Sequence, residues 1–595
     1  MATLLAQHNV PLAVADHLSP MIQDVFDGEV AKGYSCARTK TTAILNRAVA
    51  PAFKAQLVTT MQQKPFSIMI DGSSDTGLEK MNPITVRIFD IGRDKVDTRF
   101  LDMCTTSGVA AATAETIWNK MDQVLSSCDV PWINCVGVGV DNTSVNLGKH
   151  NSIKSRVQQV NNSIYFMGCP CHLAHNTACA AADSFNRTTA FDIEEMAVDL
   201  YYWFDKSSKR KNVLQDYCCF NDVTYRQVIK HVSTRWLSLE TAVERTLKVY
   251  EGLRSYFLSE NESQARFKRL KELFSSPMTE IYLLFFQSVL PTFTHFNMFL
   301  QREDPCIHLV YGQCVSLLQK LLGKFVKIRA MKAASHPTEV DYQEKNNQLP
   351  DSNVFIGFTT KTKLQKLERE GDVAPSDVEK FMRGVRQYYM SAVKHIREKY
   401  PFGDEVLKHS KFVDFDNREN VEYTDVEYFV HRYTDLLKFN PEEVNTLHDE
   451  FVEYQLMEKT DIPPAVWKAA RDREETDDNG EEKEPFARMD VLWAFLSKKK
   501  SPDGCQMRFA NLAKLAQLVL VLPHSNASEE RLFSLVRLNK TSYRSRLSLD
   551  GTLSSILTIK MHNAEPCYKF EPTNEMLENA KRATREYNQQ HLKQN

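Results

Sequence analysis

The stretches FSIMID (residues 66–71) and WINCVGVGVD (residues 132–141) decide the fold that we expect for this chain. Each is a short apolar run that ends on an acid, Asp71 in the first and Asp141 in the second. Valines at every second position of 136–140 follow the period of a β-strand. The same alternation at 84–88 and 96–100 predicts two more strands, which the turn residues GRDK (92–95) join.

The order of these elements indicates an α/β fold. Helical spacing follows at 113–125 and again in the polar segment before 160, and residues 164–167 predict a last strand. The order β-β-β-α-β-α-β over about 105 residues is that of the ribonuclease-H-like fold, a mixed five-stranded sheet with flanking helices. The first and fourth strands are neighbours in that fold, so we expect Asp71 and Asp141 at one edge of the sheet.

The rest of the chain is predicted to be helical. We divide it into an N-terminal helical segment (1–62), a first part of the core (63–240), a large all-helical insertion domain (241–505) and a C-terminal part that completes the core (506–595). Residues 471–484 contain eight acids against three bases, which predicts a solvated linker. Near residue 526 a capping box of Asn526 and Glu529 is expected to begin a helix.

Composition narrows the classes of function. The chain has 595 residues, with 74 Lys and Arg against 76 Asp and Glu, so its formal net charge is −2 and it is no bulk polycation. Any nucleic-acid contact must therefore come from local basic patches. The apolar runs are shorter than the roughly 20 residues of a membrane span, so no membrane partner is expected. The N-terminus does not resemble a secretory signal, and thirteen cysteines form no evident disulfide framework, which favours a reducing compartment.

Two carboxylates at neighbouring strand ends suggest chemistry. Like charges held together need a cation to stay ionised, and carboxylate oxygens select Mg²⁺ or Mn²⁺. A pair of such ions can activate a water or a 3′-hydroxyl for phosphodiester displacement. The alternative is that Asp71 and Asp141 are only polar strand ends.

Five segments of the chain resemble motifs of the hAT-family DNA transposases, in the order of that family. They are IMIDGSSD (68–75), VGVDNTSVN (138–146), GCPCHLAHN (168–176), STRWLS (233–238) and HSNASEERLFS (524–534). The family's usual tryptophan after the first aspartate is replaced here, because Gly72, Ser73 and Ser74 follow Asp71. In that family a helical domain interrupts the ribonuclease-H-like core before its last acid, as the insertion predicted here would do.

The resemblance implies the site residues. The catalytic and metal-binding acids would be Asp71, Asp141 and Glu530, holding Mg²⁺ or Mn²⁺ in a DDE-type site. Glu529 is the nearest rival, and the Glu-Arg order favours Glu530. Trp236 would stack on an extruded base, whereas Trp236 taken alone is more often a core residue. The residues expected to contact DNA are Arg235, Trp236, Cys169, His172, Arg531, Arg537 and Lys540.

A zinc site is the competing interpretation of one motif. Cys169, Cys171, His172 and His175 are candidate ligands, but four ligands within seven residues would strain a tetrahedral site, and no remote pair completes it. We therefore expect no structural zinc. The family's N-terminal BED-type zinc finger is also not found in this sequence.

The resemblance implies a DNA transposase that cleaves and transfers strands with a divalent metal, works in the nucleus (or waits in the cytoplasm before import), and is not secreted. The alternative is a domesticated, non-cleaving protein that binds nucleic acid or regulates. A ribonuclease-H-like nuclease acting on RNA–DNA hybrids fits only the acids. The C-terminal region resembles the family's dimerisation region, and apolar stripes at 512–522 and 553–561 would be partly exposed on a monomer. We expect a homodimer or higher oligomer that binds DNA.

Overall fold

The computed structural model describes residues 1–74, 80–106, 113–232, 237–471, 486–501, 504–541, 547–562 and 566–592. The chain forms two compact units. The first, which we call the sheet unit, consists of Met1–Cys169, Gln301–His308 and Glu405–Asn595, and the second, the helical unit, consists of Pro170–Leu300 and Leu309–Asp404. Each unit is described by itself below.

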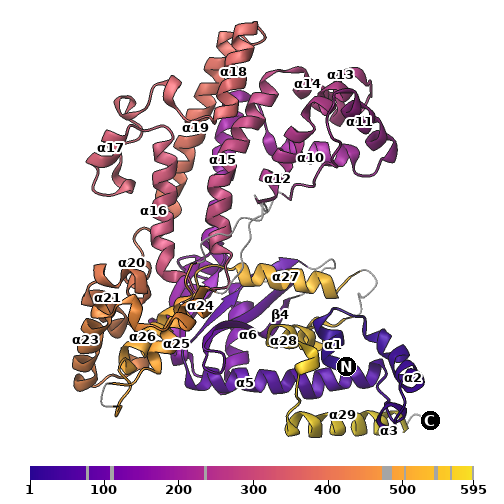
Figure 1. Cartoon of the computed structure of the whole chain (residues 1–595), viewed down its shortest axis with the longest axis vertical. Coiled ribbons are helices and arrows are strands. Elements are labelled where there is room, and N and C mark those ends of the chain that lie inside the picture. Colours follow the sequence, from indigo (N-terminus) through magenta and orange to yellow (C-terminus); the bar gives the residue numbers. More distant parts are fainter. Residues whose placement is uncertain are drawn as a thin grey trace. The chain divides into compact units, whose positions relative to one another are not determined.

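One mixed sheet organises the sheet unit (Figure 1). Its strands are β1 (Phe66–Ile70), β2 (Ser73–Ser74), β3 (Lys80–Asp90), β4 (Lys95–Thr106), β5 (Cys135–Val140) and β6 (Tyr165–Gly168). β3 pairs antiparallel with β4 on one side and with β1 on the other, and β1 pairs in parallel with β5, which pairs in parallel with β6. The two-residue β2 pairs with β3 beyond the end of β1, so the sheet is five strands wide. The predicted strand order and the pairing of the first and fourth predicted strands are confirmed.

The helices of the sheet unit come from three parts of the sequence. Before and within the sheet lie α1 (Ala2–Gln7), α2 (Ala15–Val25), α3 (Glu29–Lys32), α4 (Arg38–Ile44), α5 (Ala50–Gln63), α6 (Ala114–Ser127), α7 (Ser144–Leu147) and α8 (Ile153–Val160). After the helical unit come α20 (Glu405–His409), α21 (Tyr423–Arg432), α22 (Thr434–Leu437), α23 (Pro441–Leu456), α24 (Pro464–Arg471) and α25 (Met489–Ser497). The last are α26 (Ala510–Leu520), α27 (Ala527–Asn539), α28 (Ser554–His562) and α29 (Asn574–Leu592).

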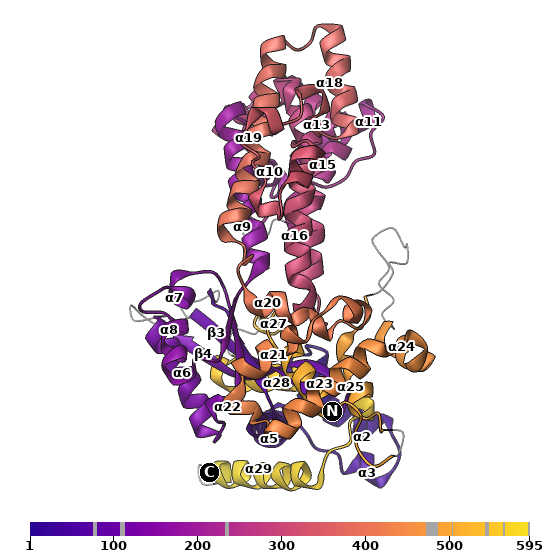
Figure 2. The same ribbon diagram turned by 90° about the vertical axis from the view of Figure 1, so that its left-hand side faces the viewer.

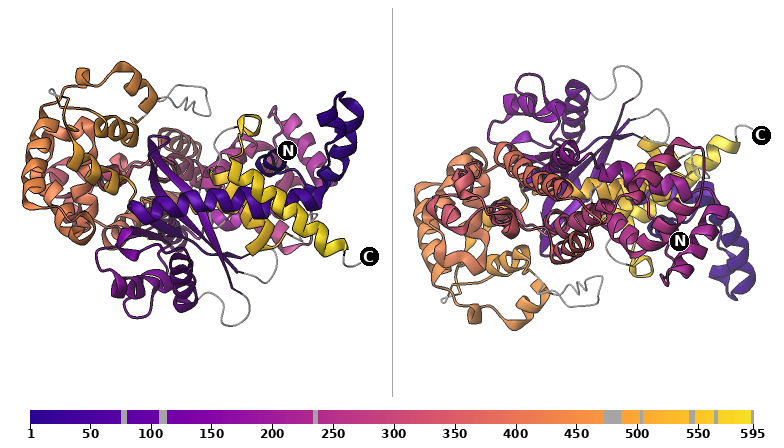
Figure 3. Two further views of the ribbon diagram at one scale, coloured as in Figure 1. Left: turned by 90° about the horizontal axis from the view of Figure 1, so that it is seen from below. Right: turned by 90° about the horizontal axis from the view of Figure 1, so that it is seen from above.

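One face of the sheet is covered by α5, α6 and α8. Apolar residues of β1, β3 and β5 form a continuous buried core with these helices, and the rings of Trp118 and Trp132 stack at its margin with centroids 5.0 Å apart. Seen from below, α5 runs across the strands (Figure 3). Thr113 caps α6 through a hydrogen bond from Thr116 N, as its position in the sequence predicts.

The other face receives the C-terminal part of the chain. Leu532 and Val536 of α27 pack on apolar residues of β3 and β4, 400 residues away in sequence or more. The glycines in the VGVGV segment of β5 explain how the C-terminal part of the chain comes so close to this face of the sheet. A Cβ added to Gly137 would lie 2.7 Å from Pro523 Cδ, so only glycine leaves space for the turn between α26 and α27. The glycines of this motif therefore admit the turn, while Val138 and Val140 fill the opposite core.

The two ends of the chain pack together. The yellow helix α29 lies below the indigo N-terminal helices (Figures 1 and 2), and Arg47 Nη1 is 2.8 Å from Glu586 Oε2. Ala6, Phe53, Ile556 and Met576 share a small core there. The N-terminal segment thus belongs to the sheet unit.

The helical unit is built on α9 (Pro170–Thr189), α15 (Met278–Leu300), α16 (Ile307–Gly323) and α19 (Pro375–Lys399). α9 packs along α19, and Thr177 Oγ1 lies 2.9 Å from His395 Nδ1. Phe185 contacts Phe285 and Phe286 in an aromatic core. The remaining helices of this unit are α10 (Ile193–Phe204), α11 (Ser208–Phe220), α12 (Leu237–Lys248), α13 (Tyr250–Ser259), α14 (Ala265–Ser275), α17 (Ile328–Ala333) and α18 (Phe358–Glu370).

The unit boundaries differ from the predicted ones of 241 and 505. Residues 170–240 belong to the helical unit from the first turn of α9, because α9 packs along α19. Residues 405–505 belong to the sheet unit, where Tyr433 donates a hydrogen bond of 2.9 Å to the carbonyl of Val136 in β5. Helical periodicity could not separate these two groups, since helices of both units have the same pattern. The predicted acidic linker (471–484) lies outside the described residues except for Arg471.

The structure also shows where the two apolar stripes of the C-terminal region lie. Leu512, Leu515, Val519 and Leu522 have no exposed surface, and Leu553, Ile556 and Leu557 are buried as well. The stripes that were expected to be partly exposed are therefore covered within the chain, and they give no reason for self-association. Among the described residues, no helix is both long enough and apolar enough to cross a bilayer.

Candidate active site

Asp71 directly follows β1 and is buried. Its Oδ1 accepts a hydrogen bond of 2.8 Å from the backbone N–H of Gly72. Burial of a carboxylate is unfavourable unless hydrogen bonds or a cation compensate for the lost water. Asp71 is therefore a buried carboxyl group at the end of β1 that needs such compensation.

Asp141 directly follows β5, the parallel neighbour of β1. Its Oδ1 accepts hydrogen bonds from Thr143 N (2.9 Å), Thr143 Oγ1 (2.6 Å) and Asn146 Nδ2 (2.5 Å). These contacts fix the carboxylate at the start of the loop into α7. The ends of β1 and β5 thus carry the two aspartates at the same edge of the sheet, as predicted.

The acid that α27 brings to Asp71 is Glu529. This side chain has no exposed surface, and one carboxylate oxygen accepts a hydrogen bond from the Thr85 hydroxyl of β3. Burial raises the pKa of Glu529 to about 8, and the nearby charge of Asp71 adds to the rise. The other oxygen, Oε2, is buried without a hydrogen-bond partner among the described residues. Asp71 and Glu529 therefore form a coupled pair of acids.

Glu530, the acid favoured by the family pattern, lies at the next position of α27 and is half-buried. The predicted capping box is wrong: Asn526 precedes α27 without a side-chain cap, and Glu529 bonds Thr85 instead of its helix N-terminus. The helix begins where predicted, but the side chains of Asn526 and Glu529 make tertiary contacts instead of capping it. Glu529 and Glu530 are thus both candidates for the third acid, and the carboxyl of Glu529 bonds Thr85 and interacts with Asp71.

Cys169 has a structural role in the same region. It is buried at the end of β6, and its Sγ accepts a hydrogen bond from Asn526 N at 3.4 Å. Asn526 Nδ2 also reaches the carbonyl of Ile70 in β1 at 3.5 Å. These two contacts dock the turn before α27 against the ends of β6 and β1. Sequence reasoning assigned Cys169 to DNA contact and did not find Thr85, although its alternation with buried Ile84 and Val86 already placed it on the other face.

The remaining predicted DNA contacts are divided between the two units and the residues outside the described ranges. His172 lies in α9 of the helical unit, and Arg235 and Trp236 lie outside the described residues. Arg537 is exposed in the last turn of α27, and Lys540 caps the end of that helix. Arg531 donates a hydrogen bond of 2.7 Å to the carbonyl of Gln301.

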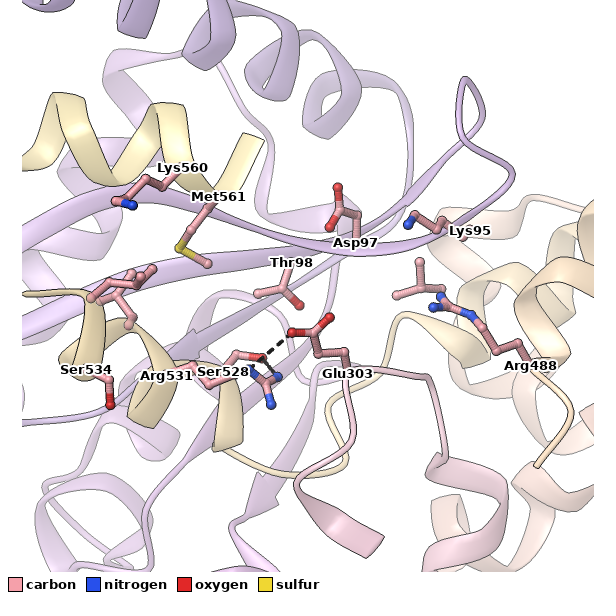
Figure 4. Close-up of a pocket in the computed structure, with 13 residues that line it drawn as sticks. Lys95, Asp97, Thr98, Glu303, Arg488, Ser528, Arg531, Ser534, Lys560 and Met561 are labelled. Carbon is pink, nitrogen blue, oxygen red and sulfur yellow. Dashed lines mark hydrogen bonds and ion pairs between the residues drawn. The ribbon is translucent and has the colours of Figure 1, made fainter. Parts of the chain in front are cut away.

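A pocket of about 480 Å³ lies beside α27 (Figure 4). Arg531 reaches from α27 towards Glu303, with Nε and Oε1 3.5 Å apart, while Lys95 and Asp97 come from β4. Arg488 is bound at 2.8 Å to Asp304. Acids within the unit thus neutralise part of the basic lining. The full lining is Lys95, Val96, Asp97, Thr98, Glu303, Arg488, Ser528, Arg531, Leu532, Ser534, Leu535, Lys560 and Met561.

The acidic pair fits a hard divalent cation. A cation beside Asp71 and Glu529 would stabilise the charged form of Glu529, whose pKa burial and Asp71 raise, and oxygen donors suit Mg²⁺ or Mn²⁺. As the side chains stand, no three His, Cys, Asp or Glu residues within the described ranges already surround one point as metal ligands do. No protein-family model matches the sequence.

Proposed function

We propose that this protein is a DNA-cleaving enzyme of the transposase type, similar to the hAT family, with a ribonuclease-H-like core. The observation that carries the proposal is the meeting of Glu529 with the Asp71 side of the sheet across 458 residues (529 − 71). If α27 only covered this face of the sheet, an apolar side chain would be expected at position 529 instead of an acid buried beside another acid. Further support comes from the strand order β4-β3-β1-β5-β6 and from Asp141 at the end of β5.

The roles follow from these positions. Asp71, Asp141 and an acid of α27 would hold Mg²⁺ or Mn²⁺, which when bound activates the attacking hydroxyl and stabilises the leaving oxygen. Thr85 orients the Glu529 carboxyl, and Cys169 with Asn526 docks α27 against the strands. Phosphate contacts would come from exposed bases such as Arg537. A nuclear location belongs to this proposal.

Nicking of supercoiled DNA in Mg²⁺ or Mn²⁺ tests the proposal. We expect Asp71→Asn and Asp141→Asn to abolish nicking, and the comparison of Glu529→Gln with Glu530→Gln to identify the third acid. Asp27→Asn changes an exposed aspartate of the N-terminal segment. It is the matched control and should nick like the wild type. If the purified wild type shows no metal-dependent nicking, or if Asp71→Asn keeps it, the proposal fails.

A second candidate is a non-cleaving, DNA-binding protein derived from such an enzyme. It is favoured by the state of Glu529, because burial and the charge of Asp71 raise its pKa to about 8 and so leave a neutral carboxyl at pH 7. This candidate predicts DNA binding in a gel-shift assay without nicking in either metal. Self-association would then rest on the C-terminal resemblance alone, since the apolar stripes are buried.

A further inference from the structure

A cluster of side chains with metal-binding chemistry lies inside the helical unit, away from the acidic pair. His175 and Cys179 lie one turn apart on α9, Glu194 lies in the first turn of α10, and His231 lies in the segment between α11 and α12. Three contacts link them in a chain. Cys179 Sγ is 3.7 Å from His175 Nε2 and 3.9 Å from Glu194 Oε1, and Glu194 Oε2 is 3.7 Å from His231 Nε2.

The separation between Glu194 and His231 suits coordination better than hydrogen bonding. A hydrogen bond between an imidazole N–H and a carboxylate is about 2.7–3.2 Å long, so 3.7 Å between Glu194 and His231 is too long for one. Zinc bonds of about 2.0–2.3 Å at tetrahedral angles place neighbouring donor atoms roughly 3.4–3.6 Å apart. All three observed separations lie within about 0.3 Å of those edges.

The environment of His231 points to the same interpretation. Its side chain is fully buried, and Nε2 has no hydrogen-bond partner among the described residues. Nδ1 lies 3.0 Å from Ser238 Oγ, which fixes the ring with Nε2 turned towards Glu194. Metal-binding histidines are held in this way through their second nitrogen. An unsatisfied buried nitrogen aimed at a carboxylate is unfavourable without a cation.

The two residues on α9 have matching properties. They are four positions apart, so they share one face of the helix. His175, Cys179 and Glu194 are partly exposed, and 30% of the Glu194 side chain is accessible, so an ion can enter from this side.

We propose that His175, Cys179, Glu194 and His231 bind one Zn²⁺ ion. A mixed sulfur, nitrogen and oxygen set is typical of zinc, and four protein ligands make a closed, structural site. The side chains do not yet enclose a common point, so binding requires them to turn inwards, and the thiol of Cys179 releases its proton to solvent. The ion would then join α9, α10 and the segment that leads into residue 232.

This set differs from the four residues that the sequence suggested. Of those, Cys169 belongs to the sheet unit and bonds Asn526, while His175 alone is shared with the proposed site. Glu194 and His231 could not be found by spacing, because 56 residues separate His175 from His231 (231 − 175). The proposal is independent of DNA cleavage.

Metal content of the purified full-length protein tests the site. After expression with added zinc and dialysis against buffer free of metal, mass spectrometry should find about one zinc per chain. Cys179→Ser and His231→Gln should each lose most of it, whereas the exposed control variants Cys219→Ser and His295→Gln should keep it. Asp71→Asn should also keep it, which separates this site from the acidic pair.

Cobalt provides a second readout that does not depend on yield. Co²⁺ added to the zinc-free protein should produce a thiolate-to-cobalt charge-transfer band in the near ultraviolet, and Cys179→Ser should remove that band while His295→Gln keeps it. The proposal is overturned if the wild type carries less than a tenth of an equivalent of zinc and shows no such band. It is also overturned if Cys179→Ser and His231→Gln both retain zinc.

Discussion

Replacing Glu529 by glutamine should change how the stability of the sheet unit depends on pH. Glu529 has an ordinary pKa of 4.5 that burial and Asp71 raise to about 8 in the folded chain. Between these two values the folded state keeps a proton that the unfolded state has lost. The contribution of Glu529 to stability is therefore fully present below pH 4.5 and is lost as the pH rises to about 8.

The magnitude follows from the proton linkage. Each pH unit inside this window lowers the free energy of unfolding by up to about 1.4 kcal/mol. From pH 5.5 to pH 7.5 the loss from this group is then at most about 3 kcal/mol. Glutamine cannot ionise and still accepts from the Thr85 hydroxyl, so Glu529→Gln should remove that part of the slope. At pH 7.5 the variant should be more stable than the wild type.

Urea denaturation of the full chain at pH 5.5, 6.5 and 7.5 measures this effect. The quantity to compare is the difference between variant and wild type at each pH, because all other titrating groups cancel in it. Glu530→Gln, one position along the same helix, is the matched control and should follow the wild type. If Glu529→Gln and the wild type have parallel pH profiles, Glu529 is ionised in the fold and the buried acidic pair is wrong.

Two packing contacts give further predictions. Gly137→Ala should destabilise the sheet unit by about 1–3 kcal/mol, because its Cβ would overlap the proline ring after α26; Gly312→Ala, with open space around the added methyl, should not destabilise, and equal melting curves for the two would contradict this packing. Glu450→Ala should cost about 1–3 kcal/mol, because its carboxylate accepts the Leu512 N–H at 2.7 Å at the start of α26. The exposed neighbour Glu453→Ala should change unfolding by less than about 1 kcal/mol, and an equally small effect of Glu450→Ala would contradict the assignment of α23 to the sheet unit.

The sheet was predictable because each of its strands has a local pattern in the sequence. Period-two alternation and the turn between β3 and β4 predicted the meander. The apolar runs before Asp71 and Asp141 predicted the two parallel strands. The strand order then followed from the few ways in which such elements can connect. The expectation of two aspartates at one sheet edge came from the same rule.

The contacts that complete the site were not predictable in the same way. Which of Glu529 and Glu530 faces the sheet depends on the rotation of α27, and that rotation is set by the docking of Asn526 on Cys169. The two glycines of β5 carried the only sequence signal for this approach, because they mark a face where backbone or side chains come close. The limits of the two compact units were not predictable, since a helical pattern does not say which core a helix joins.

The most direct test of the acidic pair is a crystal structure of the protein soaked in Mn²⁺, with anomalous scattering to locate the metal. We predict manganese bound by Asp71 and Asp141 together with an acid of α27, and weaker binding at pH 6 than at pH 8, since Glu529 must lose its proton first. An anomalous map with no manganese at Asp71 at pH 8, or manganese held only by residues elsewhere, would contradict the proposed active site.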